Sequence, residues 1–94
     1  MIGQVIRCGD DIHQTERTLL VHKDIPAGGE IPEHNHPNHN IYFIVTKGKF
    51  NITLGGSEVH EVKAGEALQF SGDNTISAQC DEDSQAFVSL TKMD

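Results

Sequence analysis

The chain has 94 residues, a length that corresponds to one domain spanning residues 1–94 with one modest hydrophobic core. Its formal net charge is −7, from 14 acidic and 7 basic residues, which argues against nucleic acid and an anionic membrane surface as partners. No apolar run approaches the length of a membrane span, and residues 1–7 lack the basic segment and apolar run of a secretory signal. We therefore expect a cytoplasmic protein.

The two cysteines, Cys8 and Cys80, agree with that expectation. They lie far apart in the sequence, without the close pairing of a redox motif or a zinc knuckle. We interpret them as small buried apolar residues in a reducing compartment.

Short segments rich in β-branched and aromatic residues alternate with turn residues along the chain. The run at 41–46 is largely apolar at successive positions, which predicts a strand buried on both faces. The polar stretch 11–17 is typical of a surface connection. Because no segment has a sustained helical periodicity, the pattern predicts an all-β fold of about eight or nine short antiparallel strands. The expected strands cover residues 2–8, 17–25, 30–36, 41–46, 50–54, 57–62, 67–70, 75–80 and 85–90.

Three of the six histidines, His34, His36 and His39, lie close together around Pro37. In an extended chain, side chains two residues apart point to the same face, so His34 and His36 are expected to face one point. Pro37 favours an extended conformation at His36 and can lead the chain into a corner at residues 38–40. Three such imidazoles could hold a first-row divalent metal, provided that a further ligand arrives from elsewhere. In the alternative interpretation, His34 and His36 are polar residues at a barrel mouth, hydrogen-bonded to backbone or water with no metal present.

This stretch resembles the first of two motifs that identify the cupins, which are small jelly-roll barrels. That motif is a glycine, five residues, His-x-His, three or four residues, a glutamate, six residues and a glycine, and Gly28, His34, His36 and Gly48 match it. The second motif begins with a glycine, which Gly65 matches. The resemblance implies an all-β, cupin-type jelly-roll barrel.

The chain departs from the cupin motifs at two of the four metal-ligand positions of the family. Counting back from Gly48 puts Ile41 at the glutamate position, and counting forward from the His-x-His pair puts Asn40 there. Ile76 stands at the position of the histidine in the second motif. The resemblance therefore implies a site with reduced affinity for iron or manganese, because it lacks the negative charge of a carboxylate. If His39 turns inward, a site of three ring nitrogens would suit zinc, copper or nickel.

Two functions follow, and the sequence leaves open whether the protein is an enzyme. In the first, the barrel binds a small polar molecule, such as a sugar, an organic acid or another metabolite, in a cavity. That cavity is expected near His34, His36, Tyr42 and Ile76. In the second, one divalent transition metal (Zn, Ni, Fe, Mn or Cu) serves an oxygenase or isomerase. Its expected ligands are His34, His36, and His39 or Asn40.

A third interpretation is an accessory protein that acts through an acidic surface. It would use Glu58, Glu61 and residues 81–83, although clusters of this kind are usually solvated. The resemblance also implies a homodimer, since single-domain cupins commonly pair with their N-terminal strands crossing between subunits. Residues 1–8 are then expected to form a strand that packs on, or is exchanged with, a partner chain.

Overall fold

The computed structural model describes residues 2–7 and 12–93 of the chain. These residues form nine strands, and every strand pair in them is antiparallel. No helix among them is long and apolar enough to cross a membrane. The strands are β1 (Ile12–Gln14), β2 (Thr18–Ile25), β3 (Glu30–His34), β4 (His39–Lys47), β5 (Lys49–Leu54), β6 (Glu58–Lys63), β7 (Ala67–Ser71), β8 (Ile76–Gln79) and β9 (Ser84–Lys92).

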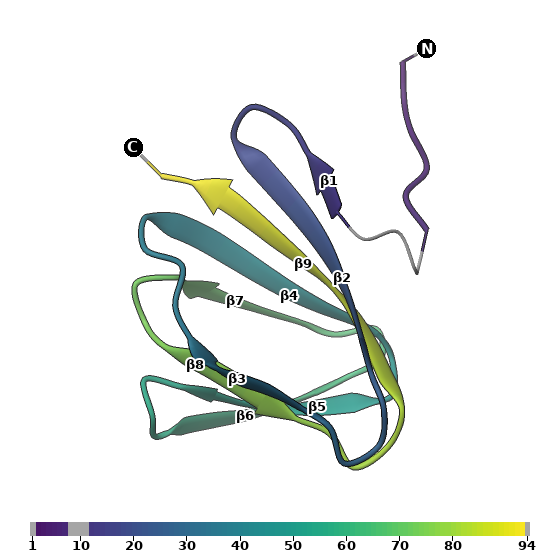
Figure 1. Ribbon diagram of the computed structural model, residues 1–94, viewed down its shortest axis with the longest axis vertical. Coiled ribbons are helices and arrows are strands. Elements are labelled where there is room, and N and C mark those ends of the chain that lie inside the picture. Colours follow the sequence, from purple (N-terminus) through teal and green to yellow (C-terminus); the bar gives the residue numbers. More distant parts are fainter. Residues whose placement is uncertain (1, 8–11, 94) are drawn as a thin grey trace.

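The strands form two facing sheets (Figure 1). One sheet has five strands in the order β1-β2-β9-β4-β7, and the other has four in the order β3-β8-β5-β6. The two layers approach each other near the β2–β3 connection and diverge toward the opposite end (Figure 1). Consecutive strands β2, β3 and β4 alternate between the sheets, so the segment that carries the histidine cluster crosses from one layer to the other.

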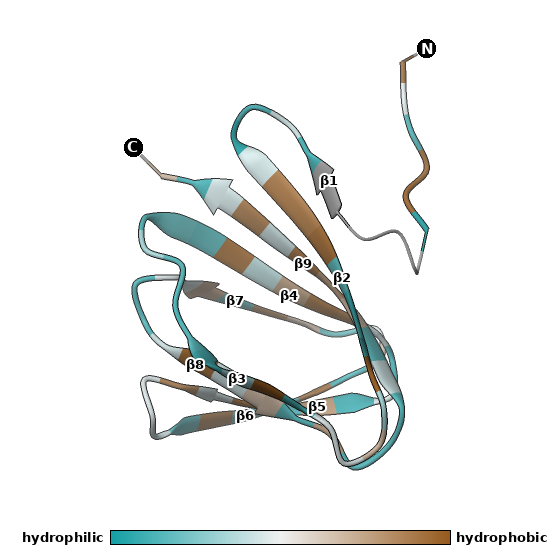
Figure 2. Cartoon of the chain, viewed as in Figure 1, coloured by the Kyte–Doolittle hydropathy of each residue, from teal (hydrophilic) through white to brown (hydrophobic). Residues whose placement is uncertain are grey.

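The core lies between the sheets and follows from the alternation of side chains along each strand. On β9, four alternate residues starting at Ser84 are buried while those between them are half-buried, and β5 alternates in the same way. Hydrophobic residues run along β2, β4 and β8, whereas the turns are mostly hydrophilic or intermediate (Figure 2). Cys80 is only 2% exposed and its thiol is free, as the sequence predicts, whereas Cys8 lies outside the described residues.

Strand β4 is buried on one face only, so the prediction of burial on both faces is wrong. Ile41, Phe43 and Val45 are each 1% exposed, but Tyr42 and Ile44 are 44% and 37% exposed. The reason is that an antiparallel sheet can pack one face on the core and leave the other to solvent, and apolar residues can occupy both faces.

The beginning of the chain also differs from the prediction. Residues 2–7 form no strand within this chain, and residue 8 lies outside the described residues. By contrast, the supposed connection at 11–17 contains β1, which pairs with β2. Such a short edge strand carries too little periodicity to be seen in the sequence, because backbone pairing rather than an apolar pattern defines it. Exchange of residues 1–8 with a partner chain stays a prediction.

Candidate functional site

A cavity of about 430 Å³ lies between the two sheets. Its walls are mostly apolar and come from both layers, with Leu19, Val21 and Leu90 on one sheet and Ile31 and Ile76 on the other. Four side chains with polar groups also line it, namely Lys23, Glu33, His34 and His36. The cavity therefore combines a large apolar surface with a few groups that can hydrogen-bond or carry charge.

An irregularity in β3 turns His34 toward this cavity. Ile31 pairs with Ala78 and His34 pairs with Ile76, so three residues of β3 are matched to two of β8. In a regular strand, residues three apart face opposite sides, but the extra residue of a β-bulge restores them to the same side. Pro32 lies within the irregularity of this edge strand, and bulges and edge strands are the places where a sheet tolerates proline. His34 consequently shares the inner face with the buried Ile31.

Gly72 holds the backbone of His36 in place. The His36 N–H donates a hydrogen bond to the Gly72 carbonyl at 2.9 Å. A Cβ at Gly72 would collide with the carbonyl oxygen of His36, so the two segments approach closely only because residue 72 is a glycine. Sequence reasoning missed this role, since a glycine in an expected loop gives no sign of which segment lies against it.

The imidazoles of His34, His36 and His39 form a cluster. Ring centroids are 4.8 Å apart for His34 and His36, and 6.4 Å apart for His36 and His39. Nδ1 of His34 lies 2.8 Å from the Pro32 carbonyl oxygen, and Nδ1 of His39 lies 2.9 Å from that of Pro37. Because a carbonyl oxygen only accepts, each Nδ1 must donate. In the neutral rings, Nε2 is then left as an acceptor or a metal ligand.

The pKa of His36 is lowered from 6.5. The largest cause is desolvation by burial, followed by the positive charges that His34, His39 and Lys23 would place near it. The lowered pKa of His36 favours the neutral imidazole, which can donate one hydrogen bond and accept another.

The residues present do not reproduce the four metal ligands that the resemblance implies. Ile41 and Ile76, at the positions of the family's glutamate and second-motif histidine, are buried apolar residues on the cavity wall. Within residues 2–7 and 12–93, no three His, Cys, Asp or Glu side chains are arranged to hold a metal ion. A site on the three clustered histidines stays a prediction.

Two residues expected at the site lie elsewhere. Asn40 and Tyr42 alternate with the buried Ile41 along β4, so they lie on the outer face of the sheet. The Asn40 side-chain oxygen accepts a hydrogen bond from Gln69 Nε2 at 2.5 Å. Neither residue joins the histidines, contrary to the expectation of Asn40 as a ligand and Tyr42 as a cavity residue. Of the residues expected at the cavity, His34, His36 and Ile76 do line it.

Lys23 is a charged cavity residue that sequence reasoning missed. It pairs across the sheet with Ala86, which is fully buried, so its side chain starts on the inner face of β2. A signal was present, because Leu19, Val21, Lys23 and Ile25 alternate along one strand and the lysine shares the face of three apolar residues.

Comparisons with known proteins agree with this architecture. The family model described as the cupin domain matches residues 21–87. No curated protein matches the chain. Among solved structures, it is similar to an RmlC-like cupin family protein with a double-stranded β-helix fold from Methanocaldococcus jannaschii, with a TM-score of 0.80, 22% identity, and coverage of 98% of this chain and 93% of that one.

Two further solved structures are comparable. An RmlC-like cupin protein from Desulfovibrio desulfuricans has a TM-score of 0.79 at 20% identity, covering 94% of this chain and 90% of that one. KdgF from Halomonas sp. also has a TM-score of 0.79, at 22% identity, covering 89% of this chain and 77% of that one. Likenesses at this level of identity concern the fold alone, and they confirm the predicted jelly-roll barrel. Because the family model covers most of the sequence, the chain belongs to the cupin family.

Proposed function

We propose that this cupin domain binds a small molecule in the cavity between its two sheets. The observation that carries the proposal is the composition of that cavity, in which Lys23, His34 and His36 meet a predominantly apolar wall. Ligand pockets typically have volumes of roughly 300–1,000 Å³ and combine an apolar lining with a few polar groups that orient the ligand. At about 430 Å³, this cavity has the size and the chemistry of such a pocket.

A ligand-observed NMR screen of small acids, amides and sugars tests the proposal. The variant Ile76→Phe places a larger side chain on the cavity wall, so we expect it to weaken every hit found with the unmodified protein. Ile44→Phe makes the same change on the outer face of β4 and should preserve binding. Hits that survive Ile76→Phe unchanged would mean that binding occurs outside the cavity.

A metal-dependent reaction is the second candidate. It is supported by His34 and His39, whose Nδ1 atoms are both engaged by backbone carbonyls, which leaves Nε2 as the available ligand atom. Elemental analysis of protein purified without a histidine tag, and of a His34→Ala/His36→Ala double variant, tests it. About one metal per chain, lost in the variant, would favour this candidate. Absence of metal after incubation with Fe²⁺, Mn²⁺, Ni²⁺, Cu²⁺ or Zn²⁺ would reject it.

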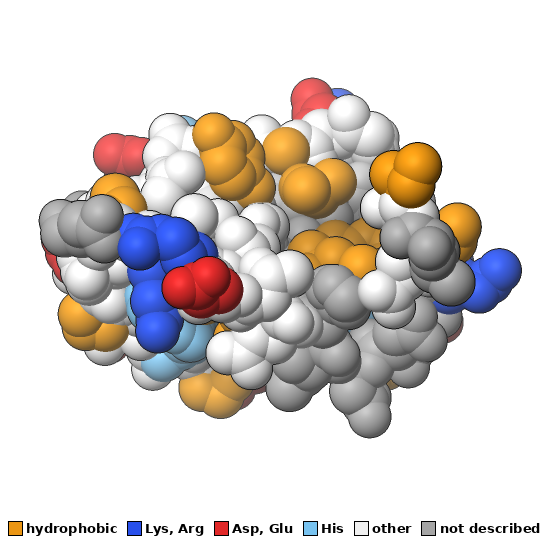
Figure 3. All heavy atoms as spheres, turned by 90° about the horizontal axis from the view of Figure 1, so that it is seen from above, with side chains coloured by type: hydrophobic (Ala, Val, Ile, Leu, Met, Phe, Trp, Pro, Cys, Tyr) orange, Lys and Arg blue, Asp and Glu red, His pale blue; other side chains and the backbone are white. Residues whose placement is uncertain are grey.

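We further propose that the protein is a homodimer. Tyr42 and Ile44 are exposed on the outer face of β4, and Ile2 and Val5 in residues 2–7 are 108% and 71% exposed. Hydrophobic side chains are visible on the face seen from above, some of them on the floor of a hollow (Figure 3). Apolar surface of this kind is typical of an interface, and a second copy would cover it.

The cytoplasm is the compartment that we propose for this protein. Support comes from the free, buried thiol of Cys80, which is typical of proteins kept in reducing conditions. Fractionation of cells that produce the protein without a tag tests this proposal, and recovery from a secreted or membrane fraction would reject it.

A further inference from the structure

Lys23 places a positive charge at an apolar cavity. Its side chain starts opposite the fully buried Ala86 and shares its face with Val21 and Ile25. It is half-buried, and it lines the cavity together with the apolar residues of both sheets. A lysine at such a position loses part of the hydration that stabilises its charge, and a partner of opposite charge can compensate for this loss.

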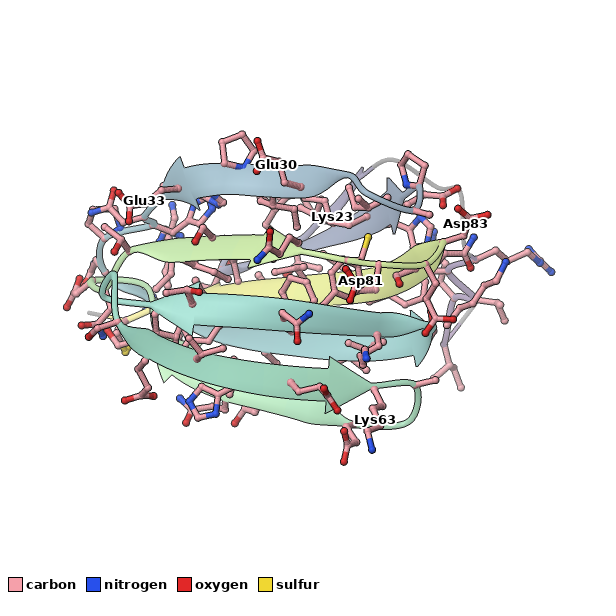
Figure 4. All side chains as sticks on the ribbon, turned by 90° about the horizontal axis from the view of Figure 1, so that it is seen from below. Lys23, Glu30, Glu33, Lys63, Asp81 and Asp83 are labelled. Atoms are coloured by element: carbon pink, nitrogen blue, oxygen red, sulfur yellow. The ribbon has the colours of Figure 1, made fainter. Side chains whose placement is uncertain are left out.

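No carboxylate of the described residues forms an ion pair with Lys23. The ion pairs found among residues 2–7 and 12–93 join Lys49 and Lys63 to Glu61, and His60 to Glu58. Glu33 is the acidic residue that lines the same cavity, but it is exposed and lies near the end of β3, away from Lys23 (Figure 4). Among the described residues, the ammonium group therefore has no carboxylate partner and is available to a ligand.

We infer that the ligand of this cavity is a small monocarboxylate with an apolar body, whose carboxylate pairs with the Lys23 ammonium. The inference rests on the proposed function and names its ligand class. The apolar body would lie against side chains such as Leu19, Ile31 and Phe70, which line the same space. A charged hydrogen bond between ammonium and carboxylate is stronger in such a partly desolvated site than in water.

The composition of the cavity favours one negative charge over several. Lys23 is the one lysine or arginine on the described lining, and Glu33 adds a negative charge at the rim. A dianion such as a phosphate monoester would therefore keep a charge without a cationic partner. A sugar is disfavoured too, because its many hydroxyl groups would meet mainly carbon atoms and lose their hydrogen bonds to water.

Three probes that share one apolar body and differ in charge test this inference by calorimetry. They are 3-phenylpropionate, the neutral 3-phenylpropionamide and the cationic 3-phenylpropylammonium. We expect the acid to bind the unmodified protein at least about tenfold more tightly than the amide, and the cation to bind more weakly than the amide. Lys23→Met should remove the tenfold preference while leaving the affinity for the amide nearly unchanged, and Lys23→Arg should keep the preference.

The outcomes separate this inference from the proposed function. Equal affinity for acid and amide in the unmodified protein would overturn the inference and leave cavity binding standing. Binding of none of the three probes would overturn the inference, and the ligand-observed NMR screen then decides on cavity binding. If Lys23→Met weakens binding of the acid and of the amide equally, Lys23 acts only by packing on the cavity wall, which also overturns the inference. If Lys23→Met does not fold, the acid-to-amide ratio of the unmodified protein and of Lys23→Arg decides. Glu33→Gln serves as a control that should strengthen binding of the acid alone.

Discussion

His34 on β3 is the cross-strand partner of Ile76 on β8, so an imidazole lies directly beside the residue that replaces the second-motif histidine of the family. Side chains opposite each other on antiparallel strands have Cβ atoms about 4.5–5.5 Å apart, which lets two imidazoles share one metal ion. This pairing indicates that one substitution, at residue 76, would place a second imidazole beside His34.

Ile76→His is therefore expected to create or strengthen binding of a divalent metal. The new ring would join the Nε2 of His34, and a site with one more imidazole should bind Zn²⁺ or Ni²⁺ at least about tenfold more tightly. Calorimetric titration of the metal-free protein measures the gain. Adding His34→Ala to the variant should abolish it, and an unchanged affinity in Ile76→His would show that the two positions do not cooperate.

Gly72→Ala should destabilise the fold by about 1–3 kcal/mol. The added methyl group would collide with the backbone carbonyl of His36, which cannot move aside as a flexible side chain would. Urea unfolding measures the change. Gly3→Ala is the matched control, because nothing lies within 4 Å of a Cβ at that position, and it should leave stability within about 0.5 kcal/mol. Equal stability of both variants would contradict the close approach of residues 72 and 36.

Ser84→Ala should lower the free energy of unfolding by about 1–3 kcal/mol, because it removes hydrogen bonds of a buried hydroxyl. The Ser84 hydroxyl is fully buried, accepts from the Lys49 N–H at 3.0 Å and lies 2.9 Å from the Glu82 carbonyl oxygen, to which it can donate. Its removal leaves the part-buried Lys49 N–H without that acceptor. Thermal unfolding compares the variant with Ser57→Ala, an exposed serine whose loss should be nearly neutral. A neutral effect at residue 84 would argue that water replaces the hydroxyl.

Acidification should destabilise the protein in part through His36. The pKa of His36 is lower in the folded state than its ordinary 6.5, so between these two values the unfolded state binds more protons. The contribution of the neutral His36 ring to the free energy of unfolding is fully present above pH 6.5. It is lost as the pH falls from 6.5 to the folded-state pKa. The stability of the unmodified, metal-free protein should consequently fall toward that of His36→Gln across this range. Asn35→Gln should keep the dependence of stability on pH that the unmodified protein shows. A difference in stability between the unmodified protein and His36→Gln that stays constant with pH would contradict the lowered pKa of His36 as the cause.

Ile44→Asp should convert a homodimer into a monomer. A carboxylate on the exposed apolar face of β4 would have to be desolvated in the interface, which is unfavourable without a partner. Light scattering after size-exclusion chromatography measures the mass, expected to be twice 10.3 kDa for the unmodified chain and close to 10.3 kDa for the variant. Val59→Asp, at an exposed position of the other sheet, is the control. A monomeric unmodified protein would reject the dimer.

The sequence was sufficient to predict most strands, because turn residues and local alternation mark them. The expected strands at 17–25 and 50–54 correspond to β2 (Thr18–Ile25) and β5 (Lys49–Leu54), each within one residue at either end. Which face of a strand is buried depends on what packs against it, and this is not a local property. For that reason β4 was wrongly expected to be buried on both faces.

The site was harder to predict for the same reason. Residue spacing predicts that His34 and His36 face one point, but His34 lies on the inner face of β3 because of a bulge between Ile31 and His34, whose existence depends on pairing with β8. Lys23 carried a readable signal, since it occupies the apolar face of β2, yet it becomes a cavity residue only when β3 lies opposite. Gly72 acts through a contact between segments far apart in the chain.

The most direct test of cavity binding is a methyl NMR titration of the protein with 3-phenylpropionate. Ile31 and Ile76 lie on the cavity wall, whereas Ile44 lies on the outer face of β4 and provides a control within the same sample. We predict saturable shifts of the Ile31 and Ile76 methyl signals with a stationary Ile44 signal. Shifts confined to Ile44, or no saturable shift at Ile31 and Ile76, would contradict binding of this carboxylate in the cavity between the two sheets.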